Sequence, residues 1–340
     1  MAREQESAVT QKWHQRLGLL HPVMQAGMAG GLAEAGLAAA VSKAGGLGTL
    51  GLLPPSQFHD QLRQLREGCN GAPFAANLLM PFVRRAHVDA CVETRPAMVS
   101  LFYGFSRAIV DRLKRAGISV WHQVGDLQQA KRAVGDGADG LIVQGSEAGG
   151  HLAGTATLAE LFPAIRKAIP DRPLLAAGGI FDTASAQAAI SLGADGVAAG
   201  TRFLLTPESG AHTEYKNRLL SATKTLRTNL FGLSWPAPHR VVANAATERW
   251  ARRQPNGPNW VHAVNTLMVP TRHVLPMESV VQLVSMQRLH VPLYSPAALT
   301  NEMNADRADV TPLYAGECVA EIESLIPAAE VVKQLASAFA

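Results

Sequence analysis

Apolar and polar positions alternate in blocks along the first 205 residues. Short, continuous apolar runs are each followed by an Ala- and Leu-rich segment with helical spacing. Continuous apolar runs are typical of parallel strands buried on both faces, and the intervening segments are long enough for crossover helices. The pattern predicts eight strands, over residues 21–26, 47–52, 74–79, 98–103, 119–124, 140–145, 173–178 and 196–201.

Eight successive strand–helix units predict an α/β fold, a closed (β/α)8 TIM barrel, with a doubly wound sheet as the structural alternative. Helix punctuation agrees with this interpretation. Residues 32–44 have a helical pattern that ends at two glycines. Asp126 is a candidate N-cap for one later helix, and Asp182 or Thr183 for another.

The pattern changes after residue 205. The remainder contains three tryptophans, several prolines, a helical stretch over 214–226 and a closing amphipathic helix over 324–338. Residues 266–316 give no clear pattern. We interpret 1–205 as the barrel core and 206–340 as the last barrel helix, an inserted, mainly helical cap subdomain and the C-terminal helix.

Composition narrows the class of protein. The 340 residues exceed the roughly 250 of a single barrel. Three widely spaced cysteines without metal-ligand spacing indicate a reducing cytoplasm. No apolar run is long enough for a membrane span. The net charge of +4 is scattered without a basic stripe, which disfavours nucleic acid as a partner and suits anionic small molecules. The oligomeric state stays open, a homodimer included.

Two glycine-rich strand ends predict a phosphate site. In this fold the loops after the seventh and eighth strands are the usual phosphate site. Ala177 is followed by Gly178 and Gly179, and the eighth strand ends at Gly200 and Thr201. Glycines let backbone N–H groups approach an anion, and a helix N-terminus adds a favourable dipole. The alternative is that these glycines only make tight turns.

The segment QGSEAGGH, residues 144–151, is the strongest candidate for chemistry. Gly149 and Gly150 permit close backbone contact with a flat ligand, and His151 carries a side chain that titrates near neutral pH. The alternative is a structural loop histidine. Glu147 could orient the loop or the histidine, or be solvated.

Other strand ends add polar groups and one decoy. The first strand ends in small residues that include Gly27, Met28 and Ala29, and the third carries Asn77. Because side chains alternate along a strand, His122 and Gln123 cannot both face inward, and we favour Gln123. The segment 46–51 matches GxGxxG, but its glycines follow a helix and enter a strand, the reverse of a dinucleotide fingerprint.

Several of these segments, taken together and in order, resemble the nitronate monooxygenase family, formerly called 2-nitropropane dioxygenases. The resemblance covers about residues 18–250, and 312–317 (PLYAGE) is similar to the family's C-terminal end. QGSEAGGH alone is less specific, because enoyl-ACP reductase II and certain FMN-dependent NADH:quinone reductases share nearly the same loop. The segments are HPVMQAGMAGG, AAAVSKAGGLGTLG, NLLMP, QGSEAGGH, AAGGI and GTRFLLTPES.

The resemblance implies an FMN-containing barrel with a helical lid and a catalytic histidine at His151. This sequence departs from the family at three positions. The family often has Pro at the position of Gly27 and Arg at the position of Leu152, and some reductase relatives have Lys at the position of Gln123. These departures surround the substrate. The implied FMN contacts are Gly27, Met28, Ala29, Asn77, Gln123, Gln144, Gly149, Ala177, Gly178, Gly179, Gly200 and Thr201.

Three functions follow as hypotheses. The first is the oxidation of alkyl nitronates, or of nitroalkanes, with O2 to a carbonyl compound and nitrite. In it His151 acts as general base for a neutral nitroalkane and, protonated or hydrogen-bonding, stabilises a nitronate. The second is NAD(P)H-dependent reduction of quinones or enoyl thioesters, and the third is a flavin-binding carrier or sensor without turnover. None of them requires a metal.

Overall fold

All eight predicted strands are present and form one parallel sheet. Its order is β1-β9-β8-β6-β5-β4-β3-β2, and a parallel bridge between Met24 and Leu47 joins the two edge strands. The structure is a computed structural model that describes residues 12–274 and 279–340. Its closed barrel excludes the doubly wound sheet that the sequence left as an alternative. The strands are β1 (Val23–Gln25), β2 (Gly48–Leu50), β3 (Phe74–Leu79), β4 (Met98–Phe102), β5 (Ser119–Val124), β6 (Gly140–Gln144), β8 (Leu174–Ala177) and β9 (Gly196–Ala199).

Side chains fill the barrel interior at its amino end. Trp13 of the short helix α2 (Trp13–Arg16) packs against Trp121 of β5, with ring centroids 5.1 Å apart. Its indole N–H donates to the carbonyl oxygen of Asp195 at 2.8 Å. This packing fills the amino end and leaves the carboxyl end of the barrel open. The apolar side chains that pack with the two rings are Met24, Leu47, Ala75, Met98, Ile142, Leu175 and Ala198.

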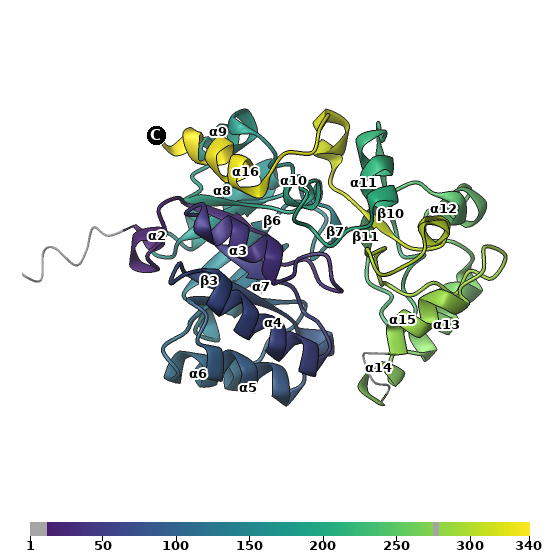
Figure 1. Ribbon diagram of the computed structural model, residues 1–340, viewed down its shortest axis with the longest axis horizontal. Helices are drawn as coiled ribbons and strands as arrows, with labels where there is room; N and C mark the ends of the chain where they lie inside the picture. The colour runs from purple at the N-terminus through teal and green to yellow at the C-terminus, as the bar shows by residue number, and fades with distance from the viewer. Residues whose placement is uncertain (1–11, 275–278) are drawn as a thin grey trace, which may run out of the picture.

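Helices cover the outside of the barrel (Figure 1). Asp126 caps α7 by accepting the Gln129 N–H at 2.7 Å, and Asp182 rather than Thr183 caps α9. The last helix of the layer, α16, packs against α3 and α9. The helices are α3 (Ala35–Lys43), α4 (Pro55–Gly68), α5 (Arg85–Thr94), α6 (Arg107–Arg115), α7 (Leu127–Gly135), α8 (Leu158–Ala168), α9 (Thr183–Ser191), α10 (Thr201–Leu204) and α16 (Ala328–Ala336), with 3-10 turns η2 (Met80–Phe82) and η5 (Ser337–Phe339).

The GxGxxG segment leads from α3 into β2, as the sequence indicates, and its glycines serve packing. A Cβ on Gly48 would lie 1.8 Å from the carbonyl oxygen of Ala38 in α3. Only glycine lets this helix approach the strand so closely. The dinucleotide alternative is therefore excluded by the order of the elements.

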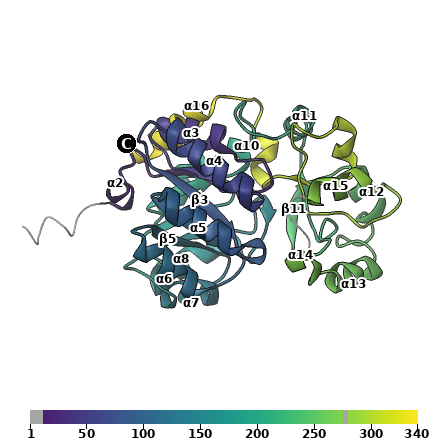
Figure 2. The same ribbon diagram turned by 60° about the horizontal axis from the view of Figure 1, so that its bottom comes forward.

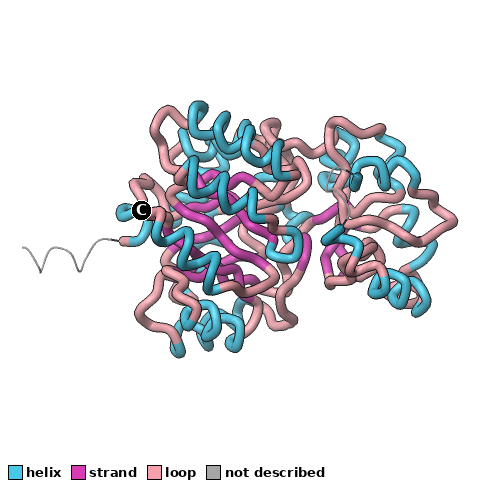
Figure 3. Tube along the Cα trace, turned by 90° about the horizontal axis from the view of Figure 1, so that it is seen from below, coloured by secondary structure: helices cyan, strands magenta, loops and turns pink. Residues whose placement is uncertain are grey.

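The second lobe contains a small antiparallel sheet as well as helices (Figures 1 and 3). Strand β11 pairs with β10, β12 and β7, and β7 belongs to the loop after the sixth barrel strand. The helix predicted over 214–226 ends at Leu220 and is followed by strand β10, so the predicted C-terminal end of this helix was wrong. The elements are α11 (Thr213–Leu220), β10 (Thr225–Thr228), β11 (His239–Val242), α12 (Ala245–Trp250), α13 (Asn259–Leu267), α14 (Thr271–Val274), α15 (Ser279–Met286), η3 (Ala305–Asp309), β12 (Leu313–Tyr314), η4 (Glu317–Glu321) and β7 (Gly150–His151).

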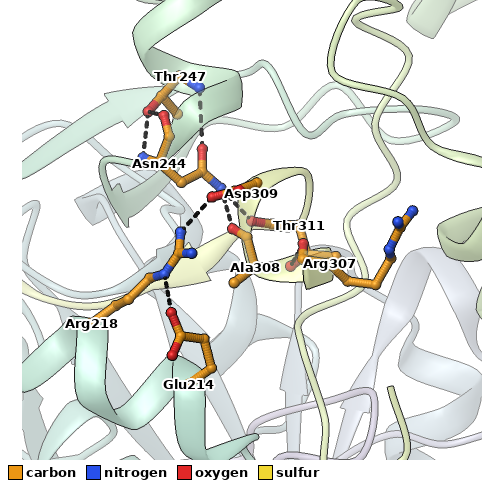
Figure 4. Close-up of polar contacts among 8 residues, drawn as sticks. All are labelled: Glu214, Arg218, Asn244, Thr247, Arg307, Ala308, Asp309 and Thr311. Atoms are coloured by element: carbon orange, nitrogen blue, oxygen red, sulfur yellow. Dashed lines mark hydrogen bonds and ion pairs between the residues drawn. The ribbon is translucent and has the colours of Figure 1, made fainter. Parts of the chain in front are cut away.

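A polar cluster anchors the chain where it returns from this lobe to the barrel (Figure 4). The Asn244 side chain caps α12 by accepting the Thr247 N–H, and its amide donates to the carbonyl oxygens of Ala308 at 2.9 Å and Thr311 at 2.8 Å. Arg218 of α11 donates to Asp309 at 2.7 Å. These bonds fix residues 308–311 immediately before β12. Figure 2 shows the helices of this lobe beside the barrel.

All three cysteines are free and buried. In the part of the chain that the structure describes, no helix has the length and apolar character needed to cross a membrane.

Candidate active site

A cavity of about 1020 Å³ opens at the carboxyl end of the barrel, between the strand ends and the second lobe. This volume is at the upper end of the range for small-molecule sites. Every residue that the sequence predicted for the site lines it: Gly27, Met28, Ala29, Asn77, Gln123, Gln144, Gly149, His151, Ala177, Gly178, Gly179, Gly200 and Thr201.

The loops after β8 and β9 form one glycine-lined corner of the cavity. Gly178 and Gly179 have φ angles of +117° and +69°, which favour glycine. Within residues 12–274 and 279–340, no hydrogen bond uses the backbone N–H of Gly179, Gly200 or Thr201. The Thr201 hydroxyl accepts the Gly316 N–H at 2.9 Å, which leaves its own hydrogen available. These donors suit an anion.

Another part of the cavity wall combines a small residue with an oriented amide. A Cβ on Gly27 would lie 2.3 Å from Cβ of Asn77, so the two positions depend on each other. The Asn77 amide donates to the hydroxyl of Ser100 at 2.9 Å, which leaves Asn77 Oδ1 as an acceptor. Asn77 and Ser100 both line the cavity. An N–H group on the edge of a flat heterocycle would complete this site.

Gln123 faces the cavity and His122 does not, as the alternation along β5 predicts. The His122 ring stacks on Phe105 at 4.4 Å, and its nitrogens lie within hydrogen-bond distance of the carbonyl oxygens of Gln123 and Gly104. His122 is thus a structural residue of the barrel wall.

Gln144 holds the loop that carries His151. Its amide donates to the carbonyl oxygen of His151 and accepts the Ala153 N–H, both at 3.0 Å. Both polar atoms of the side chain are therefore used by the loop. The structure gives a packing reason for glycine at position 149, in addition to the predicted contact with a flat ligand. A Cβ on Gly149 would lie 2.5 Å from the backbone of Ala315. The returning chain before η4 occupies that space.

Glu147 orients the loop and does not contact His151. Its carboxylate accepts the Leu158 N–H at 2.9 Å, at the start of α8, and its carbonyl oxygen accepts the Glu317 N–H at 3.0 Å. Arg240 of β11 donates to the carbonyl oxygen of Ser146 at 2.7 Å and pairs with Glu317 at 2.8 Å. Between the two alternatives left open by the sequence, the loop-orienting role is confirmed over the solvated one.

His151 lies in an aromatic enclosure. Its ring stacks on Trp235 with centroids 3.8 Å apart and planes 21° apart, and His239 and Tyr314 lie at 5.2 and 5.4 Å. Nε2 is buried without a partner among the described residues. Burial, together with the nearby His239, holds the pKa of His151 well below its usual value. The neutral imidazole is therefore the resting form, and the protonated form expected for binding a nitronate is disfavoured.

Sequence reasoning missed the residues that surround this histidine. Trp235, His239 and Tyr314 come from the second lobe, where no strand pattern was visible. Tyr103 follows β4 with a φ of +60° and donates its hydroxyl to the carbonyl oxygen of Leu152. The similarity of 312–317 to the family's end was the one available signal, and it did not indicate that Tyr314 and Gly316 line the cavity.

A family model described as nitronate monooxygenase matches residues 12–86 and 80–338. The chain belongs to the nitronate monooxygenase family. Among curated relatives, the Pseudomonas aeruginosa nitronate monooxygenase is 31% identical over 295 residues, covering 70% of this chain and 82% of the relative.

A second kind of relative is a (3aS,4S,5R,7aS)-5-hydroxy-7a-methyl-1-oxo-octahydro-1H-indene-4-carboxyl-CoA dehydrogenase from Rhodococcus jostii, 34% identical over 232 residues. The match covers 66% of this chain and 64% of the dehydrogenase, so it spans just under two thirds of that protein. Both relatives, the dehydrogenase and the monooxygenase, are oxidoreductases by name.

Two solved structures share the fold over nearly the whole chain. FabK from Thermotoga maritima is 25% identical with a TM-score of 0.76, covering 97% of this chain and 96% of FabK. A nitroalkane oxidase from Streptomyces ansochromogenes is 28% identical with a TM-score of 0.75, covering 94% and 95%. The likeness to FabK agrees with the reductase relatives that the loop motif indicated.

One end of the cavity is acidic. Among the described residues, its lining includes the carboxylates Glu34, Asp60 and Glu302 and no Lys or Arg. Burial, and then the charge of Glu302, raise the pKa of Glu34. An extended anionic group would therefore meet repulsion rather than a counter-ion at this end.

Proposed function

We propose that the protein is an FMN-dependent nitronate monooxygenase, which oxidises alkyl nitronates with O2 to a carbonyl compound and nitrite. The observation that carries the proposal is one cavity with a glycine-lined anion corner and a neutral, stacked histidine at another part of its wall. The family match supports the reaction class.

The residues of the cavity fit a flavin mononucleotide. The free N–H groups around Gly179 and Thr201 would hold its phosphate, and the small residues Gly27 and Ala177 leave room for a flat ring. Asn77 Oδ1 and Gln123, which line the cavity, would face the polar edge of the ring. The GxGxxG segment 46–51 runs from helix α3 into strand β2, the reverse of an adenine-dinucleotide fingerprint, which favours FMN over FAD. The group would supply the acceptance of electrons from the substrate and their delivery to O2.

His151 would act on the substrate from the wall of the cavity. A pre-formed nitronate needs no proton transfer, so there the neutral ring would only help to position the substrate in the cavity. For a neutral nitroalkane it would accept the α-proton at its lone pair, and the C–H electron pair would remain on the substrate as the nitronate. Trp235 fixes the plane of the ring.

A second function is the oxidation or reduction of an acyl thioester, favoured by the CoA dehydrogenase and FabK likenesses. The cavity volume would accommodate a longer substrate beside the flavin. Against it stand Glu34, Asp60 and Glu302, because the phosphates of CoA would find no cation in the described lining. This charge pattern makes the small nitronate the first choice.

One experiment separates the two functions. The purified yellow protein is mixed anaerobically with an alkyl nitronate, with NADH, with NADPH and with an acyl-CoA, and the flavin absorbance is followed; the flavin is then released by heat and chromatographed. We expect FMN, and bleaching by the nitronate alone. Bleaching by NADH, NADPH or the acyl-CoA without any by the nitronate would reject the proposal, and FAD would reject the cofactor assignment.

A further inference from the structure

Two histidines face each other at the inner side of the cavity wall. His151 and His239 are directly opposite in the antiparallel pair β7–β11, and their ring centroids are 5.2 Å apart. His239 is fully buried. The Nε2 atoms of both rings are buried and have no hydrogen-bond partner in the described part of the chain. A buried polar atom without a partner in a native protein calls for an explanation.

The hydrogen on His239 can be assigned from its one hydrogen bond. Its Nδ1 lies 2.9 Å from the carbonyl oxygen of Ala237. A carbonyl oxygen only accepts, so Nδ1 carries the hydrogen. Burial lowers the pKa of His239 to about 4, so the ring is neutral. In a neutral imidazole with its hydrogen on Nδ1, Nε2 is a bare acceptor. His239 therefore presents a buried lone pair next to His151.

Two tyrosine hydroxyls are the competing acceptors near His151. That of Tyr314 donates to the carbonyl oxygen of Pro296 and that of Tyr103 to the carbonyl oxygen of Leu152, and each oxygen keeps lone pairs. Neither hydroxyl is hydrogen-bonded to Nε2 of His151. Trp235 covers the face of the His151 ring rather than an edge. No carboxylate among the described residues forms an ion pair with His151, in contrast to the carboxylate partner that many catalytic histidines have.

We propose that His239 is a positioning residue that holds His151 in the tautomer with its hydrogen on Nε2. The acceptor would be His239 Nε2, reached directly by a small rotation of the ring or through one water molecule. Nδ1 of His151, which unlike Nε2 is not a buried atom, then directs its lone pair into the cavity. The consequence for catalysis rests on the proposed function; the tautomer does not.

The proton balance of the step is simple. The α-C–H bond of a nitroalkane breaks, its electron pair stays on the substrate, and the proton goes to Nδ1 of His151. The resulting imidazolium donates its Nε2–H to the lone pair of His239, which remains neutral. Because that acceptor lacks the charge of a carboxylate, the arrangement stabilises the imidazolium only by one hydrogen bond, about tenfold in rate.

The test is the ¹⁵N NMR spectrum of the FMN-loaded protein labelled at histidine, with the His151 signals assigned by their loss in His151→Asn. The wild type should show a protonated Nε2 and an unprotonated Nδ1. His239→Phe keeps an aromatic ring but removes the acceptor, and should give a mixture of tautomers. His239→Gln keeps an acceptor oxygen and should restore the wild-type signals. Tyr314→Phe, which removes a competing hydroxyl, should leave them unchanged.

Kinetics provide a second reading on the same variants. With a neutral nitroalkane, His239→Phe should lose about tenfold in kcat and His239→Gln should recover most of it, at unchanged FMN content. A wild-type His151 with its hydrogen on Nδ1, or a tautomer that is the same in His239→Phe, would overturn the inference. If the tautomer shifts as expected but no nitroalkane or nitronate is turned over, the inference stands and the proposed function fails.

Discussion

The substitution His151→Asn removes the imidazole from the cavity while leaving its loop in place. The clamp from Gln144 uses only main-chain atoms of residues 151 and 153, so it survives the change. The predicted phosphate corner is formed by other loops, around Gly179 and Thr201. We therefore expect a folded protein that retains its FMN.

The expected loss depends on the substrate. General-base catalysis contributes roughly 100- to 10,000-fold, or about 3 to 5 kcal/mol of barrier. Because burial lowers the pKa of His151 and so weakens it as a base, we expect the lower part of this range for neutral nitroalkanes, roughly 100- to 1,000-fold. Pre-formed nitronates need no deprotonation, and a His151 lone pair rather than an N–H faces them, so they should lose less than about tenfold.

The assay is O2 consumption with the same nitro compound supplied as the neutral acid and as the pre-formed nitronate, normalised to flavin content. His122→Asn is the matched control. It also removes a buried imidazole, from strand β5, but the side chain of His122 does not line the cavity. The control should keep the wild-type ratio between the two activities, even if the protein becomes less stable.

The comparison of the two substrates decides the role of His151. Equal losses with both would argue against a base and for electrostatic stabilisation of the nitronate. Unchanged activity with both would show that His151 is a structural residue of the aromatic enclosure and would refute the central assignment.

Three further predictions concern the cofactor, the second lobe and pH. Gly179→Asp, which places a carboxylate in the anion corner, should give folded but colourless protein, whereas Gly117→Asp, at a similar positive φ in open space, should keep its FMN by absorbance. Asn244→Ala should lower the free energy of unfolding by about 2 to 3 kcal/mol in urea titrations, and Asn304→Ala, whose side chain caps nothing, by much less. Because His239 has a pKa of about 4 folded against 6.5 in a model chain, the unfolded state binds more protons between these values; stability should be full above about pH 7 and fall by about 3 kcal/mol towards pH 4, with a shallower slope in His239→Phe.

The barrel was predictable because its signals are local. Each strand is a continuous apolar run, each helix follows with its own cap, and the carboxyl ends of parallel strands necessarily meet at one mouth. That geometry brought Gly27, Asn77 and His151 to one cavity without knowledge of any long-range contact. Their roles towards FMN stay predictions.

The small sheet was not predictable in this way. Its strands have two to four residues, too few to display a period of two. Strand β7 exists only because Gly150 and His151 pair with Arg240 and His239, some ninety residues later in the chain. The neighbours of His151 are consequences of this pairing, and so the enclosure could not be inferred. The boundary at residue 205 between core and cap likewise stays a prediction.

Two of the departures from the family pattern, Gly27 and Gln123, line the cavity, whereas Leu152 lies behind its wall. Where relatives often have Arg, Leu152 is buried, its N–H donates to the carbonyl oxygen of Pro238 at 2.9 Å and its carbonyl oxygen accepts from Tyr103. No Lys or Arg of the described chain replaces that cation in the lining. A neutral nitroalkane needs no such cation on binding: its α-proton passes to His151, and the N–H formed there then faces the new negative charge. The proposed hydrogen bond to His239 would keep the His151 lone pair directed into the cavity for this step.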